Sequence, residues 1–123
     1  MRPNDAALDR KVRLQIHGSD RSGPDAVTKL AHEITTEVRH HTGIQSYRWS
    51  RDPQLGTWII EEEYEDGPAF SAHMRWMASS GYLRTLGKAL KVDRVVLLSG
   101  DQPLVAAEIG PLPISVYSVV DSL

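Results

Sequence analysis

The sequence has no cysteine among its 123 residues, so disulfides, thiolate nucleophiles and zinc–thiolate sites are excluded. It also lacks an apolar run near the roughly 18 residues that a membrane-spanning helix needs. The chain also lacks a large excess of one charge, because acidic and basic residues are scattered along it and the formal net charge is −2. Without a basic stripe for phosphate contacts, we expect no nucleic-acid partner, and we expect no membrane partner.

Motifs for cofactors and metals are also absent. No G-x-G-x-x-G or phosphate loop occurs, so no nucleotide site is indicated. His40 and His41 are adjacent, so on a helix they point about 100° apart and cannot chelate one metal together. Glu33, Glu37 and His41 share i, i+4 spacing, but no His-Glu-x-x-His set is present. We therefore expect neither a metal nor a cofactor.

The composition that is present is ordinary. Hydrophobic residues make up 41% of the chain and charged residues 24%, which is typical of a soluble globular protein. A chain of this length predicts one domain. The first ten residues are polar and lack the apolar segment of a signal peptide, so we expect a cytoplasmic location.

Hydrophobic periodicity predicts the order of the elements. Alternation predicts strands over residues 12–17, 44–51 and 57–64, with a turn at 52–56 that joins the last two as a hairpin. Helical spacing predicts helices over 24–41 and from 67–68 to 77–78, followed by a short helix from 82 to about 90. A continuous apolar run then predicts a strand over 92–99. This βαββαβ order predicts a ferredoxin-like α+β fold, with both main helices on one face of a four-stranded antiparallel sheet.

Three segments are predicted along the chain. Residues 1–9 form a flexible leader and residues 10–100 the ferredoxin-like domain. Residues 101–123 form an apolar C-terminal extension that is too hydrophobic to stay solvated. We expect it to pack on the domain or on a partner protomer. Ile114, Val116 and the pair Tyr117 and Val119 resemble strand residues, which we expect to add to an exposed sheet edge of the same or the partner protomer.

The junction between the third strand and the second main helix carries a motif. It has the pattern E-x-Y-x-D-x-x-A-F-x-x-H, in which the matching residues are Glu62, Tyr64, Asp66, Ala69, Phe70 and His73. The chain thereby resembles the antibiotic biosynthesis monooxygenase-like family, over about residues 11 to 100. The resemblance implies a dimeric α+β barrel, in which a second protomer covers the bare face of the sheet, so we expect a homodimer. It also implies that His73 borders the ligand cavity.

Two residues of this motif are candidates for catalysis. His73 lies in the second turn of its helix and can give or take a proton near neutral pH. Glu62 shares a strand face with Trp58, Ile60 and Tyr64 because side chains alternate along a strand. A carboxyl group drawn into an apolar interior must be paired, hydrogen-bonded or protonated. The alternatives are a core histidine and an ion pair that only ties strand to helix.

Aromatic residues are dense between residues 47 and 82, and large flat side chains suit a flat aromatic ligand. Tyr64 and Trp76 are the candidates nearest the predicted mouth of the cavity. Trp58 and Phe70 are further candidate substrate contacts, although filling of the core is the preferred explanation for these two.

The resemblance implies a cofactor-independent monooxygenase that acts on a small electron-rich aromatic of the quinol or anthrone type. His73, with Glu62, would then move the proton. Heme-degrading relatives carry a histidine, tryptophan and asparagine set that has no counterpart here. Two alternatives stay open because fold does not fix function. They are a dimeric barrel that binds a small molecule without turnover, and an isomerase that shuttles protons.

Overall fold

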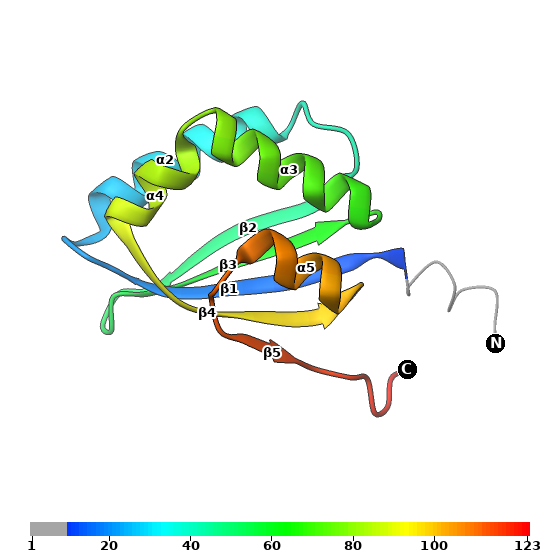
Figure 1. Cartoon of the computed structure of the whole chain (residues 1–123). Helices are drawn as coiled ribbons and strands as arrows, with labels where there is room; N and C mark the ends of the chain where they lie inside the picture. Colours follow the sequence, from blue (N-terminus) through cyan, green and yellow to red (C-terminus); the bar gives the residue numbers. More distant parts are fainter. Residues whose placement is uncertain (1–9) are drawn as a thin grey trace.

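A computed structural model of the chain describes residues 10–123, and the predicted flexible leader, residues 1–9, lies outside the described residues. Figure 1 shows the elements in chain order. They are β1 (Val12–Asp20), α2 (Pro24–Val38), β2 (Ile44–Asp52), β3 (Thr57–Tyr64), α3 (Gly67–Ser79), α4 (Tyr82–Ala89), β4 (Leu90–Ser99), α5 (Gln102–Ile109) and β5 (Ile114–Val116).

The strands form one sheet in the order β2-β3-β1-β4-β5. The first four pair antiparallel, as the ferredoxin-like prediction requires. The sheet has five strands rather than the predicted four, because β5 adds to the edge of β4 in parallel. A parallel pair needs a crossover connection, and α5 provides it.

Helix α5 was not predicted from the sequence. Its residues are apolar on all sides and show no helical stripe, and Pro103 reads as a breaker. In the structure this proline occupies the first turn, where a missing N–H costs nothing. The Asp101 carboxylate accepts a hydrogen bond from the Leu104 N–H at 3.2 Å and caps the helix, which Gly110 ends.

The helices lie on one face of the sheet (Figure 1). Two groups of buried side chains fill the space between. One lies under α2 and α4 and includes Leu30, Ile34 and Trp58. The other lies between the ends of β1 and β4 and helices α3 and α5, and includes Phe70 and Val105. None of the helices within residues 10–123 is long and apolar enough to cross a membrane.

The turn before α3 fixes where that helix begins. The Asp66 carboxylate accepts a hydrogen bond from the Ala69 N–H at 2.9 Å, as the predicted cap requires. Gly43 lies against this turn with φ of +86°, and a Cβ there would meet the Ala69 Cβ at 2.7 Å. Glycine is therefore needed at position 43 for β2 to start beside α3.

The opposite face of the sheet is lined by charged side chains. Glu63 pairs with Lys11 at 3.1 Å and lies 3.9 Å from Arg13, and Glu61 lies 3.9 Å from Arg48. The prediction that Glu61 and Glu63 pack against basic side chains is confirmed. The homodimer, in which a second protomer covers this face, stays a prediction.

Candidate functional site

The alternation along β3 carries Glu62 toward the helices. Trp58, Ile60, Glu62 and Tyr64 are all buried, and Glu62 is only 5% exposed. His73 comes from α3 on the other side of the same layer and is 3% exposed. The structure therefore brings the two candidate catalytic residues into one interior.

Glu62 is a buried carboxyl group without a positive partner. It stands opposite Tyr47 on β2 and Leu14 on β1, and its Oε1 accepts a hydrogen bond from the Tyr64 hydroxyl. No basic side chain within residues 10–123 forms an ion pair with it. Burial raises the pKa of Glu62 to about 7, although the Tyr64 hydrogen bond acts in the opposite direction. The group is therefore partly ionised at neutral pH.

His73 is surrounded by aromatic rings. Its Nε2 lies 3.3 Å from the Tyr47 hydroxyl, and its ring centroid lies 5.3 Å from that of Tyr47, 5.6 Å from Tyr64 and 5.8 Å from Trp76. Burial and, to a smaller extent, the nearby His41 together lower the pKa of His73 to about 4. The imidazole is therefore neutral at neutral pH, and its buried Nδ1 has no hydrogen-bond partner within residues 10–123.

A cavity of about 120 Å³ lies between the sheet and helices α3, α4 and α5. Most of its wall is apolar, with Leu, Ile, Val, Met and Phe side chains. The polar exceptions are Tyr47, Glu62, His73 and Glu108. Three of these four lie in the cluster described above, so the polar groups of the wall converge on one side of an otherwise hydrophobic space.

The structure places one of the four predicted aromatic contacts in the wall of the cavity and the other three outside it. Phe70 lines the cavity. Tyr64 is fully buried behind Glu62 and contributes its hydroxyl rather than a cavity surface. Trp76 lines a separate outer groove together with His41, whose ring centroid is 4.6 Å away. Trp58 does not line the cavity either.

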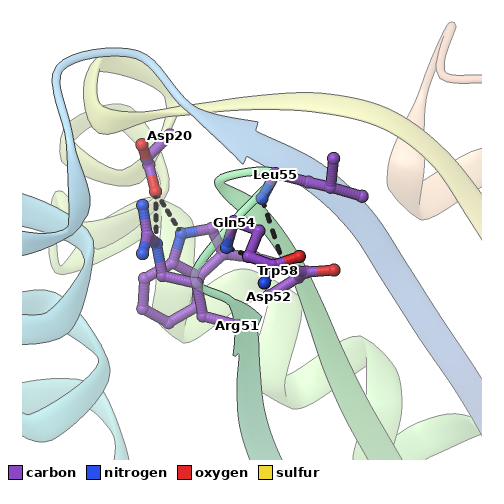
Figure 2. Close-up of polar contacts among 6 residues, drawn as sticks. All are labelled: Asp20, Arg51, Asp52, Gln54, Leu55 and Trp58. Carbon is purple, nitrogen blue, oxygen red and sulfur yellow. Dashed lines mark hydrogen bonds and ion pairs between the residues drawn. The ribbon is translucent and has the colours of Figure 1, made fainter.

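Trp58 instead belongs to a polar cluster at the other end of β3, drawn in Figure 2. The Asp20 Oδ2 accepts hydrogen bonds from the Arg51 Nε at 2.7 Å and from the Trp58 Nε1 at 2.8 Å. These two bonds, the Arg51 bond first, lower the pKa of Asp20 below its ordinary value. The cluster ties the end of β1 to the β2–β3 hairpin.

Sequence reasoning did not assign Tyr47, Glu108, Ile109 or Leu112 to the site. For Tyr47 a signal existed, since the predicted hairpin turn pairs Asp52 with Thr57 and so places residue 47 opposite residue 62. For the other three no signal existed, because α5 was not predicted.

The site can transfer protons. It combines a carboxyl group that titrates near pH 7, two phenolic hydroxyls and a neutral imidazole beside an apolar space. Within residues 10–123 there is no group of three or more histidine, aspartate and glutamate side chains that could hold a metal ion.

Comparisons with known proteins identify the fold. No family model matches the chain, and no curated protein matches it significantly. Solved structures do match. MupZ from Pseudomonas fluorescens aligns over 93% of both chains with a TM-score of 0.69 and 12% identity. Rv0793 from Mycobacterium tuberculosis aligns over 72% of this chain and 93% of its own, with a TM-score of 0.57 and 25% identity.

A third similar structure has a described activity. SnoaB from Streptomyces nogalater, a cofactor-independent oxygenase, aligns over 76% of this chain and 95% of its own, with a TM-score of 0.65 and 11% identity. At such identities the likeness shows the fold alone. The chain therefore shares the small α+β fold of these proteins, which is the fold that the motif resemblance implies.

Proposed function

We propose that this protein is a cofactor-independent oxygenase of a small electron-rich aromatic compound, such as a phenol or quinol, which binds in the cavity. The observation that carries the proposal is Glu62, a buried carboxyl group with a pKa of about 7 and no cation beside it, in the wall of an apolar cavity. Fold likeness to a cofactor-independent oxygenase supports the same class.

Glu62 is the group best suited to take the substrate's proton. A general base works best when its pKa lies near the working pH, and Glu62 meets that condition. His73, whose pKa is about 4, is unprotonated at neutral pH but is too weak a base to hold a proton taken from the substrate. We therefore assign the base to Glu62 and give His73 the role of orienting Tyr47, through the 3.3 Å contact.

The surrounding residues fit this division of roles. Tyr64 donates to Glu62 and fixes the direction of the carboxyl group. Phe70 offers a ring surface in the cavity wall. Trp76 stays a candidate contact at the outer groove, where it packs against His73, and Trp58 serves the Asp20 cluster. The apolar wall would shield the reactive anion from water.

The proposed reaction needs no cofactor, because the substrate supplies the electrons and O₂ accepts them. The substrate's O–H proton passes to the Glu62 carboxylate, and the electron pair stays on the substrate. The substrate anion gives one electron to O₂, and the two radicals then join through a new C–O bond as a peroxide anion. Return of the proton from Glu62 makes the hydroperoxide. The ring carbon that bears it then loses its hydrogen as a proton while the O–O bond breaks, and this proton and the released hydroxide leave as water, so that a carbonyl oxygen stays on that carbon.

Oxygen uptake with a panel of phenols and quinols tests this proposal. Glu62→Gln should lower kcat by about 10²–10⁴, the usual worth of a general base. Glu61→Gln, on the opposite face of the same strand, is the matched control and should keep full activity. In the wild-type protein kcat/KM should rise with pH through about 7, as Glu62 loses its proton. Full activity in Glu62→Gln would overturn the assignment.

One alternative shares the same groups. An isomerase would use Glu62 to take a proton and return it to a different carbon, and this step needs no oxygen. Deuterium exchange from solvent into the substrate under anaerobic conditions identifies it. Saturable binding without oxygen uptake or exchange would leave a binding protein on the same fold.

The proposal includes a homodimer, because the family that the motif resembles pairs its protomers through the face that carries Glu61 and Glu63. Sedimentation of the purified chain tests the assembly. A monomer at micromolar concentration would contradict it.

A further inference from the structure

We propose that helix α5 and the turn after it limit the ligand to a single aromatic ring, and that the site selects an uncharged ring with a hydroxyl group over a carboxylated one. The inference rests on the proposed function in one respect, namely that the cavity beside Glu62 is the substrate site.

The size of the cavity sets the first limit. Its volume is about 120 Å³. An apolar protein cavity of roughly 150 Å³ accepts benzene, whereas sites for larger ligands commonly measure about 300–1,000 Å³. The space therefore matches one ring, and fused rings such as naphthol or anthrone would need the wall to move.

The wall that closes this space comes from the C-terminal residues. Ile109 at the end of α5 and Leu112 in the following turn both line the cavity. The sheet residues Leu14 and Val95 and the helix residue Met74 line the same cavity. Removing side-chain atoms at Leu112 would therefore enlarge the cavity directly.

This wall is held in place at both ends. At its start Asp101 caps α5, and Val105 is fully buried. At its end the Val95 N–H donates to the Pro113 carbonyl at 2.8 Å and the Tyr117 N–H to the Leu97 carbonyl at 2.9 Å, alongside the β4–β5 pairing. A wall held by a helix cap and a buried side chain at one end, and by backbone hydrogen bonds at the other, acts as a boundary of fixed position.

The charges in the wall set the second limit. Glu62 lies on the sheet side and Glu108 on the α5 side, and both line the same cavity. A ring that donates a hydrogen bond suits a carboxyl oxygen, while a carboxylated ring would bring a further negative charge into a poorly solvated space. Phenol should therefore bind in preference to benzoate.

Calorimetric titration of the wild-type protein with phenol, hydroquinone, benzoate and naphthol, under anaerobic conditions, tests both limits. We expect saturable binding of phenol and hydroquinone. Binding of naphthol and benzoate should be weaker by at least about tenfold, which is the discrimination available to an apolar pocket for small changes in size. Naphthol that binds as tightly as phenol would overturn the size limit, and benzoate that does so would overturn the charge limit.

Three variants locate the boundary. Leu112→Ala should improve naphthol binding by at least about tenfold relative to phenol. Leu104→Ala, a matched substitution in α5 outside the cavity wall, should leave the ratio unchanged. Ile109→Phe should fill the cavity and abolish phenol binding. If Leu112→Ala does not fold, the Ile109→Phe result decides, and unchanged phenol affinity there would overturn the proposal.

The binding measurement also separates this inference from the proposed function. Single-ring binding without oxygen uptake would leave the size limit standing and refute the oxygenase. Oxygen uptake with anthrone at full rate would support the oxygenase and refute the size limit.

Discussion

Two carboxyl groups at opposite ends of the sheet show what decides the state of an acidic side chain. Asp20 is only partly buried, whereas Glu62 is buried in the core and is 5% exposed. Asp20 has the Arg51 guanidinium and the Trp58 indole N–H as donors, and its pKa is lowered (Figure 2). Among the described residues, Glu62 has the Tyr64 hydroxyl as its one donor, and its pKa is raised to about 7.

The difference teaches that strong donors beside a carboxylate lower its pKa, whereas deep burial with a single hydroxyl donor raises it, and the two conditions separate a structural carboxylate from a reactive one. A cation beside Asp20 makes the charged form stable and holds strand ends together. Without a cation, Glu62 keeps its proton until the pH approaches neutrality, which leaves it able to exchange a proton with a ligand.

The largest expected effect is on Glu62. Glu62→Gln should stabilise the protein above pH 7 while it removes activity. A pKa raised from 4.5 to about 7 means that the unfolded chain loses its proton first, so the wild type loses about 3 kcal/mol of stability between these pH values. In the variant residue 62 does not titrate, so this pH-dependent loss of stability is absent.

Urea unfolding of both proteins from acid to alkaline pH measures the difference. The two curves should run together below about pH 4.5 and separate until about pH 7, and then stay parallel. A variant that is less stable than the wild type at alkaline pH would show that Glu62 is paired with a cation after all, as Asp20 is.

His73 should show the opposite pH dependence. Its pKa falls from 6.5 to about 4 on folding, so the unfolded chain binds the proton first as the pH drops. The wild type should therefore lose about 3 kcal/mol of stability between about pH 6.5 and 4 through this residue. In His73→Gln this acid-dependent part disappears, and the loss due to Glu62 becomes visible between about pH 4.5 and 7.

The same urea unfolding series, run on His73→Gln and on the double variant with Glu62→Gln, measures how far the opposite contributions of these two residues to stability offset each other. The double variant should have the flattest curve over this range. An unchanged slope in His73→Gln would mean that the imidazole is not desolvated in the folded protein.

The strand and helix pattern of residues 12–99 could be predicted from the sequence because each element has one apolar face. Glu62 could also be placed, since alternation along β3 carries it to the same side as Trp58 and Ile60. Its proximity to His73 followed from the strand–turn–helix order. In these cases the position depends on local periodicity, which is visible in one sequence.

What could not be predicted depends on contacts between distant segments. Trp58 and Glu62 share one strand face, yet only the ends of β1 and β2 place Asp20 and Arg51 beside Trp58. Helix α5 lacks a polar face, because it packs on α3 and closes the cavity, so its periodicity is hidden. The added edge strand predicted from Ile114 and Val116 is confirmed, although it ends at Val116 and does not reach Tyr117 and Val119. Its parallel pairing with β4 depends on helix α5 and therefore could not be predicted.

A smaller effect is expected at the paired carboxylate. Asp20→Asn should lower Tm at neutral pH, because the Arg51 guanidinium loses its anionic partner. The pKa of Asp20 is lowered on folding, so its stabilising contribution is present above the ordinary value of 3.8 and is lost as the pH falls through the folded pKa. Thermal unfolding at neutral and strongly acidic pH should show a deficit only at neutral pH.

Trp58→Phe provides the control for this cluster. It removes one donor but leaves the Arg51 bond at 2.7 Å, so its effect on Tm should be smaller than that of Asp20→Asn. Oxygen uptake should be unaffected in both variants. A loss of activity in Trp58→Phe with normal stability would mean that Trp58 contacts the substrate.

The smallest effect is expected on the outer face. Glu61 lies 3.9 Å from Arg48, and their side chains are 43% and 73% exposed, so water screens the pair. Within a single protomer, Glu61→Gln should therefore change the free energy of unfolding by less than about 0.5 kcal/mol. Urea unfolding at low and high salt measures this.

Because Glu61 and Glu62 are adjacent on one strand, a large effect for one and none for the other would trace the chemistry to the face of the sheet that meets the helices. A large effect at Glu61 would instead indicate that a partner buries the outer face.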